Sequence, residues 1–282
     1  MIRFPVLLLI FSLSPWALAT EDPAPRAVYI ANMGAMIERG ETKILFDPLF
    51  HYEHDTYDRV PPEVEAALLA GDEPWDGIDA VFISHHHGDH FDPATIVALL
   101  RARPTIDLFG PEQAAAAIRE RVVDPSDPLL KRVHGLSLEN GMAATDIAFG
   151  ALLVEAVRIR HSGWPDYHAD VENIVFRVTL DNETTVMHFG DADVDDAHFA
   201  KSPEHWTERK SHLAMPPYWF FLSSDGRRIL RERIGADEVI GMHVPVSTPD
   251  DRESRHQHLQ DVDLFTQPGE TRTLEKRSAE YE

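Results

Sequence analysis

Short apolar runs separated by polar turns begin the folded part of this chain. Three such runs, at 27–30, 35–38 and 43–47, are joined by glycine-containing turns and predict antiparallel strands. From Pro48 to Pro74 the chain is polar and marked by prolines, with one predicted helix from Pro62 to Ala70 that Gly71 closes. The pattern therefore predicts a β start followed by an inserted loop.

The next hundred residues alternate between strand and helix patterns. Apolar runs at 78–84 and 105–109 predict strands, and helices are predicted over 93–103 and 111–121. Asp92 and Pro93 supply an N-cap followed by the residue favoured at the first helical position. Alternating strands and helices are typical of α/β units.

Strands recur in the second half of the chain. Apolar runs at 151–160, 173–180 and 184–189 predict strands, and the turn Asp181-Asn182-Glu183 joins the last two into a hairpin. A helix over 227–234 is predicted to end at Gly235, before a strand at 238–242. Two β-rich halves meeting near Gly150 predict an α/β or α+β fold with a two-layer sheet core and helices outside.

The N-terminus has the features of a secretory signal peptide. Arg3 precedes a short apolar run, and Ala17-Leu18-Ala19 provides an A-x-A end. The run is too short to cross a bilayer comfortably, so a retained anchor is the weaker alternative. We expect cleavage after Ala19 and a periplasmic or secreted protein with no stable membrane insertion, whose residues 20–282 form a single domain.

Composition narrows the range of functions. The chain has no cysteine, so a metal must be held by His, Asp or Glu, and thiolate zinc fingers are excluded. Its 48 acidic and 26 basic residues give a net charge of −22. A surface this negative repels nucleic acids and anionic membranes, so a nucleic-acid partner is not expected. Composition leaves the oligomeric state open.

The segment His85-His86-His87-Gly88-Asp89-His90 is the most informative motif. His85, His87, Asp89 and His90 follow the pattern His-x-His-x-Asp-His, which gathers three imidazoles and a carboxylate, the donor atoms that zinc binds. The alternative is a solvated, histidine-rich loop. A strand before the motif and a capped helix after it favour the metal site, because a rigid corner aims short side chains at one point.

Three further residues occupy comparable corners. His161, Asp191 and His243 each follow an apolar run and precede a polar or glycine-containing turn. Singly, each is better explained as a surface or turn residue. Together they predict ligands at one sheet edge. Five other histidines are not chosen: His188 lies within a strand, His86 alternates with the motif's ligands, and the loop residues His51, His54 and His168 are expected to be solvated.

In this order the motifs resemble the metallo-β-lactamase superfamily, and within it the branch of ascorbate-6-phosphate lactonase-like hydrolases and of the phospholipase D that acts on N-acyl phosphatidylethanolamines. The resemblance covers about Ala27 to Glu270. The matching segments are Ile44-Leu45-Phe46-Asp47-Pro48, residues 83–92, Arg160-His161, Gly190-Asp191, the His243 corner and Pro268-Gly269-Glu270.

The resemblance implies a four-layer αββα sandwich with two divalent metal ions at one edge. By analogy His85, His87 and His161 bind the first ion, Asp89, His90 and His243 bind the second, and Asp191 bridges them. Asp47 orients the site without ligating. Flavin-linked di-iron relatives carry a carboxylate at the position of His87, so the imidazole favours Zn²⁺ and hydrolysis, with Mn²⁺ or Fe²⁺ as alternatives.

Such a centre supplies a metal-bridging hydroxide as the nucleophile. Asp89 or Asp191 would take the proton of the water molecule or pass a proton to the leaving group. The first hypothesis is hydrolysis of a small-molecule ester or lactone. A phosphodiesterase or phospholipase D-like hydrolase, a non-catalytic metal-containing binding protein and a redox di-iron protein are the alternatives. Trp164, Tyr167, Tyr218 and Trp219 are candidate walls of the substrate pocket, although aromatic stretches are more often core.

Overall fold

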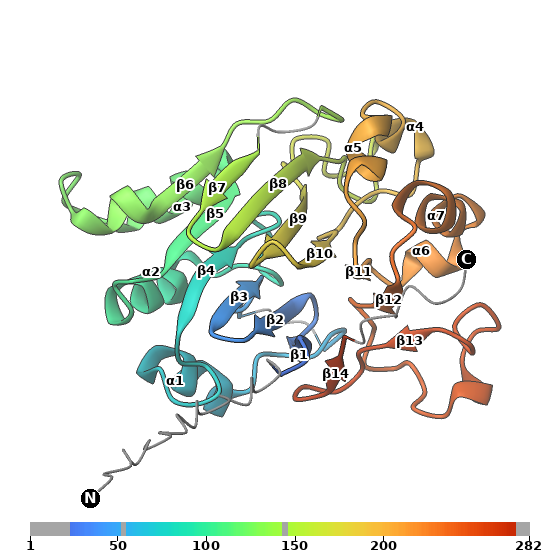
Figure 1. Ribbon diagram of the computed structural model, residues 1–282, viewed down its shortest axis with the longest axis horizontal. Coiled ribbons are helices and arrows are strands. Elements are labelled where there is room, and N and C mark those ends of the chain that lie inside the picture. The colour runs from blue at the N-terminus through green and yellow to red at the C-terminus, as the bar shows by residue number, and fades with distance from the viewer. Residues whose placement is uncertain (1–22, 52–54, 143–145, 275–282) are drawn as a thin grey trace, which may run out of the picture.

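The computed structural model describes residues 23–51, 55–142 and 146–274 (Figure 1). The predicted signal peptide, residues 1–19, lies outside these ranges. Within them, no helix combines the length and the apolar character that a membrane crossing requires.

The first sheet contains the early strands of the chain. It has seven strands in the order β14-β1-β2-β3-β4-β5-β6. The antiparallel start predicted from the sequence is confirmed, because β1 to β3 pair antiparallel, and β3 to β6 then run parallel. The strands are β1 (Arg26–Ala31), β2 (Gly34–Arg39), β3 (Thr42–Phe46), β4 (Ile78–Phe82), β5 (Asp107–Pro111), β6 (Val133–Leu136) and β14 (Thr271–Thr273).

The second sheet repeats this layout with the later strands. Its order is β13-β12-β11-β10-β9-β8-β7, with antiparallel pairing from β7 to β10 and parallel pairing from β10 to β13. The predicted hairpin is β9 and β10. The strands are β7 (Ile147–Phe149), β8 (Leu152–Arg158), β9 (Ile174–Leu180), β10 (Thr184–His188), β11 (Leu213–Met215), β12 (Glu238–Gly241) and β13 (Asp263–Leu264).

Helices lie on the outer sides of both sheets (Figure 1). Two of them begin and end as the sequence predicts: Asp92 caps α2 by accepting a hydrogen bond from the Thr95 amide, and Gly71 ends α1 with a φ of 74°. The helices are α1 (Pro62–Ala70), α2 (Pro93–Ala102), α3 (Glu112–Arg121), η1 (Pro128–Arg132), α4 (Asp196–Phe199), α5 (Pro203–Glu208), α6 (Trp219–Leu222), α7 (Ser224–Arg228), η2 (Ile229–Ile234) and η3 (Arg252–Ser254).

Three apolar layers hold these elements together. The central layer, between the sheets, includes Phe46, Phe82 and Phe176. One outer layer packs α1 to α3 on the first sheet, and the other packs α4 to α6 and η2 on the second. The predicted four-layer αββα sandwich is therefore confirmed.

Two predicted elements differ in detail. The helix over 227–234 is a short α-helix, α7, that continues into the π-helical segment η2 before Gly235. The strand expected from Thr105 begins at Asp107, because a turn in which the Ile106 amide donates to the Arg103 carbonyl precedes it. Neither difference changes the layer to which the segment belongs.

A buried ion pair joins the second sheet to α5. Glu155 on β8 and Arg177 on β9 are cross-strand partners, with exposed side-chain fractions of 2% and 0%. Arg177 Nε donates to Glu155 Oε2 at 2.9 Å, and Arg177 Nη1 also donates to the carbonyl of His205. Arg209 Nε donates to the same carboxylate at 3.1 Å. The pair therefore ties two strands to the helix that covers them.

Candidate metal centre

The structure brings the seven predicted ligands together at one edge of the sandwich. Their ligand atoms form two groups, and within each group all atoms lie within 4.8 Å of one another. The loop after β4 supplies four of the residues, and the ends of β8, β10 and β12 supply one each. The first group is His85, His87 and His161; the second is Asp89, His90, Asp191 and His243.

Asp191 lies between the two groups. Its Oδ1 is 3.2 Å from His90 Nε2 and 3.3 Å from His243 Nε2, both in the second group. Its Oδ2 is 3.4 Å from His161 Nε2, in the first group. Each carboxylate oxygen therefore faces a different group, which is the arrangement that a bridging ligand requires.

Several of these atoms are buried without a hydrogen-bond partner. They include His90 Nε2, His243 Nε2 and Asp191 Oδ1, which converge on one point. An unsatisfied buried polar atom costs about 1–3 kcal/mol. A divalent cation bound among these atoms would satisfy all three at once, so the donor set fits a metal ion.

The protonation states of His85, His87 and Asp191 also fit a cation. Burial lowers the pKa of His85 well below its usual value, and burial together with neighbouring imidazoles lowers the pKa of His87 to about 4. Burial would raise the pKa of Asp191, but His243 and His90 more than offset this and hold the pKa well below its usual range. Neutral imidazoles and an ionised carboxylate are the forms that bind metals.

Two carboxylates dominate the electrostatics of the second group. Burial lowers the pKa of His90, but the carboxylates of Asp191 and Asp89 outweigh burial and raise that pKa well above its usual value. The pKa of His243 is raised against burial by Asp191 and Asp89 as well. These carboxylates thus favour a positive charge at this point.

Asp47 orients two of the imidazoles through contacts on their Nδ1 atoms. It follows β3, is fully buried and accepts hydrogen bonds from the Ser84 amide at 2.7 Å, from Ser84 Oγ at 2.5 Å and from His90 Nδ1 at 2.8 Å. Ser84 Oγ is in turn 3.0 Å from His85 Nδ1. Asp47 therefore contacts the Nδ1 side of these rings, directly or through Ser84, and leaves each Nε2 to face the centre.

The backbone before Asp191 requires glycine. Gly190 has a φ of 52°, and a Cβ there would lie 2.6 Å from Ser84 Cβ and 2.3 Å from Asn173 Oδ1. That Asn173 oxygen accepts the Asp191 amide at 2.9 Å. Close approach of β10 to the histidine loop is thus what places Asp191 between the two groups.

Residues that the sequence analysis did not select also contact the centre. Asn32 is fully buried, and its Nδ2 donates to the Asp89 carbonyl at 2.9 Å. The sequence marks it only by its position before Met33-Gly34, and the structure places it at a turn with a φ of 47°. The ring of Tyr57 lies edge-on to His243, with centroids 4.1 Å apart. Nothing in the local pattern of the inserted loop marks Tyr57.

The histidines that were set aside have distinct surroundings. His168 is exposed, as expected of a solvated residue, but its ring also contacts His87 and His161, at centroid distances of 4.8 and 4.7 Å. His188 is buried, and its Nε2 donates to the Met33 carbonyl at 2.9 Å. His51 Nε2 lies 3.1 Å from Glu65 Oε2, and His54 is outside the described residues.

The four predicted wall residues are placed differently from one another. Trp219 contacts His243, with ring centroids 5.1 Å apart, and Tyr218 adjoins Trp219 at 5.7 Å. Trp164 instead packs on His198 and Arg160, and Tyr167 is 71% exposed. Among the ring contacts of the described residues, Trp219 is therefore the predicted wall residue that touches a candidate ligand.

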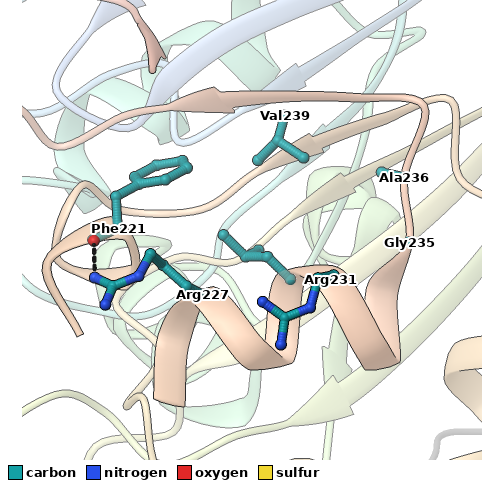
Figure 2. A pocket seen from close by; sticks show the side chains of 7 residues that line it. Phe221, Arg227, Arg231, Gly235, Ala236 and Val239 are labelled. Atoms are coloured by element: carbon teal, nitrogen blue, oxygen red, sulfur yellow. Dashed lines mark hydrogen bonds between the residues drawn. The ribbon is translucent and has the colours of Figure 1, made fainter. Parts of the chain in front are cut away.

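Figure 2 shows a depression formed by other residues. It has a volume of about 390 Å³ and lies between η2, Phe221 and Val239. Arg227 borders it and donates to the Phe221 carbonyl at 2.6 Å. Its lining contains none of the seven candidate ligands, so it is separate from the centre.

Residues 42–205 match the model of the beta-lactamase superfamily domain, which is more than half of the chain. The chain belongs to the beta-lactamase superfamily. The matched range contains Asp47, the histidine motif, His161 and Asp191, whereas His243 lies beyond it.

One curated protein resembles part of the chain. Protein Rv0786c of Mycobacterium tuberculosis is 31% identical over 96 residues, which are 33% of this chain and 37% of that protein. The chain thus matches little more than a third of that relative's length.

Solved structures support the superfamily fold. The metallo-beta-lactamase fold protein YhfI from Bacillus subtilis has a TM-score of 0.56 and 17% identity, over 88% of this chain and 98% of YhfI. Igni18, a metallo hydrolase from the archaeon Ignicoccus hospitalis, has a TM-score of 0.58 and 15% identity, over 90% of this chain and all of Igni18 (100%). At these identities the likeness concerns the fold alone.

Proposed function

We propose that this chain is an exported, metal-dependent hydrolase that uses two divalent cations, with zinc as the first choice, to cleave a small-molecule ester or lactone. The observation that carries the proposal is the position of Asp191, with one oxygen toward each group of imidazoles. We further propose that residues 20–282 form one catalytic domain after removal of the signal peptide.

The residues have separable roles in this reaction. The imidazoles and carboxylates of the two groups would hold two divalent cations, which when bound would lower the pKa of water to about 7 and stabilise the charge that develops on the attacked carbonyl oxygen. Asp191 is held with both oxygens among the imidazoles. Asp89 is more accessible, with 14% of its side chain exposed against 9% for Asp191, and Asn32 fixes its backbone. Asp89 is therefore the better placed of the two to accept a proton from water and return it to the leaving group.

The net charge of the chain and its sequence motifs support the proposed substrate class. A net charge of −22 disfavours a polyanionic substrate. Within the superfamily we place the chain in the ascorbate-6-phosphate lactonase-like branch, on the strength of residues 44–48, 83–92 and 268–270. A phosphodiesterase or phospholipase D-like activity is the second candidate, because a dinuclear centre makes its surroundings locally positive.

The histidine motif provides a matched pair of variants. We expect His87→Ala to lower metal content and hydrolysis together, because His87 belongs to the first group. His86→Ala, one residue earlier and outside both groups, should leave both largely intact. Metal content is measured by elemental analysis, and hydrolysis with a panel of lactones, aryl esters, β-lactams and bis-aryl phosphates in zinc or manganese. Equal behaviour of the two variants would refute the alternating assignment, and turnover of the phosphates alone would favour the second candidate.

Asp47 offers a test of ligand orientation. We expect Asp47→Asn to weaken metal binding by about 10–100-fold, because the carboxylate that holds His90 and, through Ser84, His85 is lost. Ser84→Ala removes the path to His85 and a 3.4 Å contact with His90 Nδ1 but keeps the hydrogen bond between Asp47 and His90, so it should have the smaller effect. The measurement is competition for zinc with a chelator of known affinity. Unchanged affinity in Asp47→Asn would show that the rings are held by packing instead.

A further inference from the structure

Three aromatic side chains lie together beside the second group of candidate ligands. We call Tyr57, Tyr218 and Trp219 the aromatic rim. Tyr57 and Trp219 both contact the ring of His243, at centroid distances of 4.1 and 5.1 Å and interplanar angles of 81° and 64°. Tyr218 continues the surface from Trp219 at 5.7 Å. All three are only partly buried, although His243 itself is 2% exposed.

The rim is held in place by contacts outside the rings. Trp219 Nε1 donates to the Ala192 carbonyl at 3.1 Å, which fixes the indole beside the residue that follows Asp191. The Tyr218 amide donates to the Met242 carbonyl at 2.8 Å. The loop that carries Tyr57 is tied to the segment after β12, because the Val246 amide donates to the Thr56 carbonyl at 2.9 Å. Rigid aromatic surface of this kind binds ligands at a low entropic cost.

The side of the first group carries a further imidazole. There the exposed imidazole of His168 packs on His87 and His161. On the rim side Val246 is 54% exposed, and the polar Thr56, to whose carbonyl it donates, is exposed as well. The two sides therefore offer different surfaces to a molecule bound across the centre, one aromatic and one rich in imidazoles.

We propose that the aromatic rim binds an apolar alkyl or aryl group of the substrate, with the hydrolysed bond over the two groups of ligands and the polar end toward His168. This inference rests on the proposed function and narrows its substrate class to amphipathic esters and lactones. Tyr57 and Trp219 are the residues that select the apolar group. Exposed apolar surface beside a buried polar centre is the usual composition of a small-molecule site.

Two series of compounds test the rim separately from the chemistry. Binding of straight-chain carboxylates from butanoate to decanoate to the zinc-loaded protein is measured by calorimetry. Hydrolysis of γ-lactones with alkyl side chains of increasing length is measured in parallel. For the wild type we expect affinity and kcat/KM to rise about two- to fourfold per methylene, as a partly buried methylene predicts.

The variants separate the rim from support of His243. Tyr57→Leu and Trp219→Ala should flatten the dependence on chain length through KM, with kcat and zinc content near the wild-type values. Tyr57→Phe should keep the dependence on chain length, because the ring is retained. Leu222→Ala changes an exposed residue of the same helix as Trp219 and is the control.

Each outcome of these measurements either supports or overturns substrate binding by the aromatic rim. Carboxylate affinity that is independent of chain length would refute binding of an apolar group by the aromatic rim, whether or not lactones are cleaved. Loss of zinc from Tyr57→Leu would also overturn it, because the ring would then serve only to hold His243. Chain-length-dependent binding without turnover of any lactone would support the rim and refute the proposed ester or lactone hydrolysis.

Discussion

If the chain is the dinuclear hydrolase proposed above, replacing Asp191 by asparagine is expected to remove both cations and to reduce hydrolysis by more than about 100-fold. This exceeds the roughly 10–100-fold loss that is typical when a residue that only orients a metal ligand is removed. The larger effect follows from position. Asp191 faces the first group with Oδ2 and the second with Oδ1, so a neutral amide weakens both at once. Elemental analysis and the turnover of the best substrate in the panel measure the two effects.

Asp193 provides the matched control for this substitution. It lies two residues further along the same loop, and its Oδ1 accepts the Asp195 amide at 2.8 Å and lies 3.9 Å from His198 Nε2. Asp193→Asn should therefore retain both cations and most of the activity. An Asp191→Asn protein that keeps two cations per chain would disprove the bridging role, whatever its activity.

The largest effect on stability is expected from Glu155→Leu. This change leaves the fully buried guanidinium of Arg177 without its carboxylate, and breaking a buried ion pair in this way costs about 3–5 kcal/mol. Urea unfolding monitored by circular dichroism measures the free energy of unfolding. The double variant Glu155→Leu with Arg177→Met should recover most of the loss, since no buried charge remains. A loss below about 1 kcal/mol, the median for exposed pairs, would show that water reaches this pair.

The same pair predicts a dependence of stability on pH. Burial raises the pKa of Glu155, but Arg177 and Arg209 more than offset burial and lower it from its usual value. A carboxyl with a lowered pKa in the folded state stabilises the protein above its unfolded-state value of about 4.3. This contribution is lost as the pH falls through the lowered value. Wild type should therefore lose more stability on acidification than the double variant.

Local sequence patterns predicted much of the fold. The strands and helices with clear apolar runs, such as β4, α2, β9 and β10, are found where the sequence predicts them, because their periodicity and capping residues act within a few positions. Short elements such as β11, with three residues, were not predicted. Such elements form because neighbouring strands already provide a partner for their backbone.

The candidate site likewise combines residues that the local sequence marks with residues that it does not mark. The histidine motif and the strand-end corners can be recognised locally, and the structure brings those seven residues together. Asn32, Tyr57 and the contact of His168 with His87 and His161 have no comparable local signal. Their roles depend on which loops meet, since Tyr57 is 186 positions from His243 along the chain and 4.1 Å from it between ring centroids.

By itself, the sequence determined which residue types stand at the strand ends, and hence the donor atoms available for a metal. Only the tertiary structure decided how those atoms are shared: Asp191 lies between two groups because the two sheets end at one edge and Gly190 lets β10 approach the histidine loop. The physical reason is that donor chemistry belongs to single side chains. Distance and burial, which govern pKa values and coordination, arise only when distant segments pack.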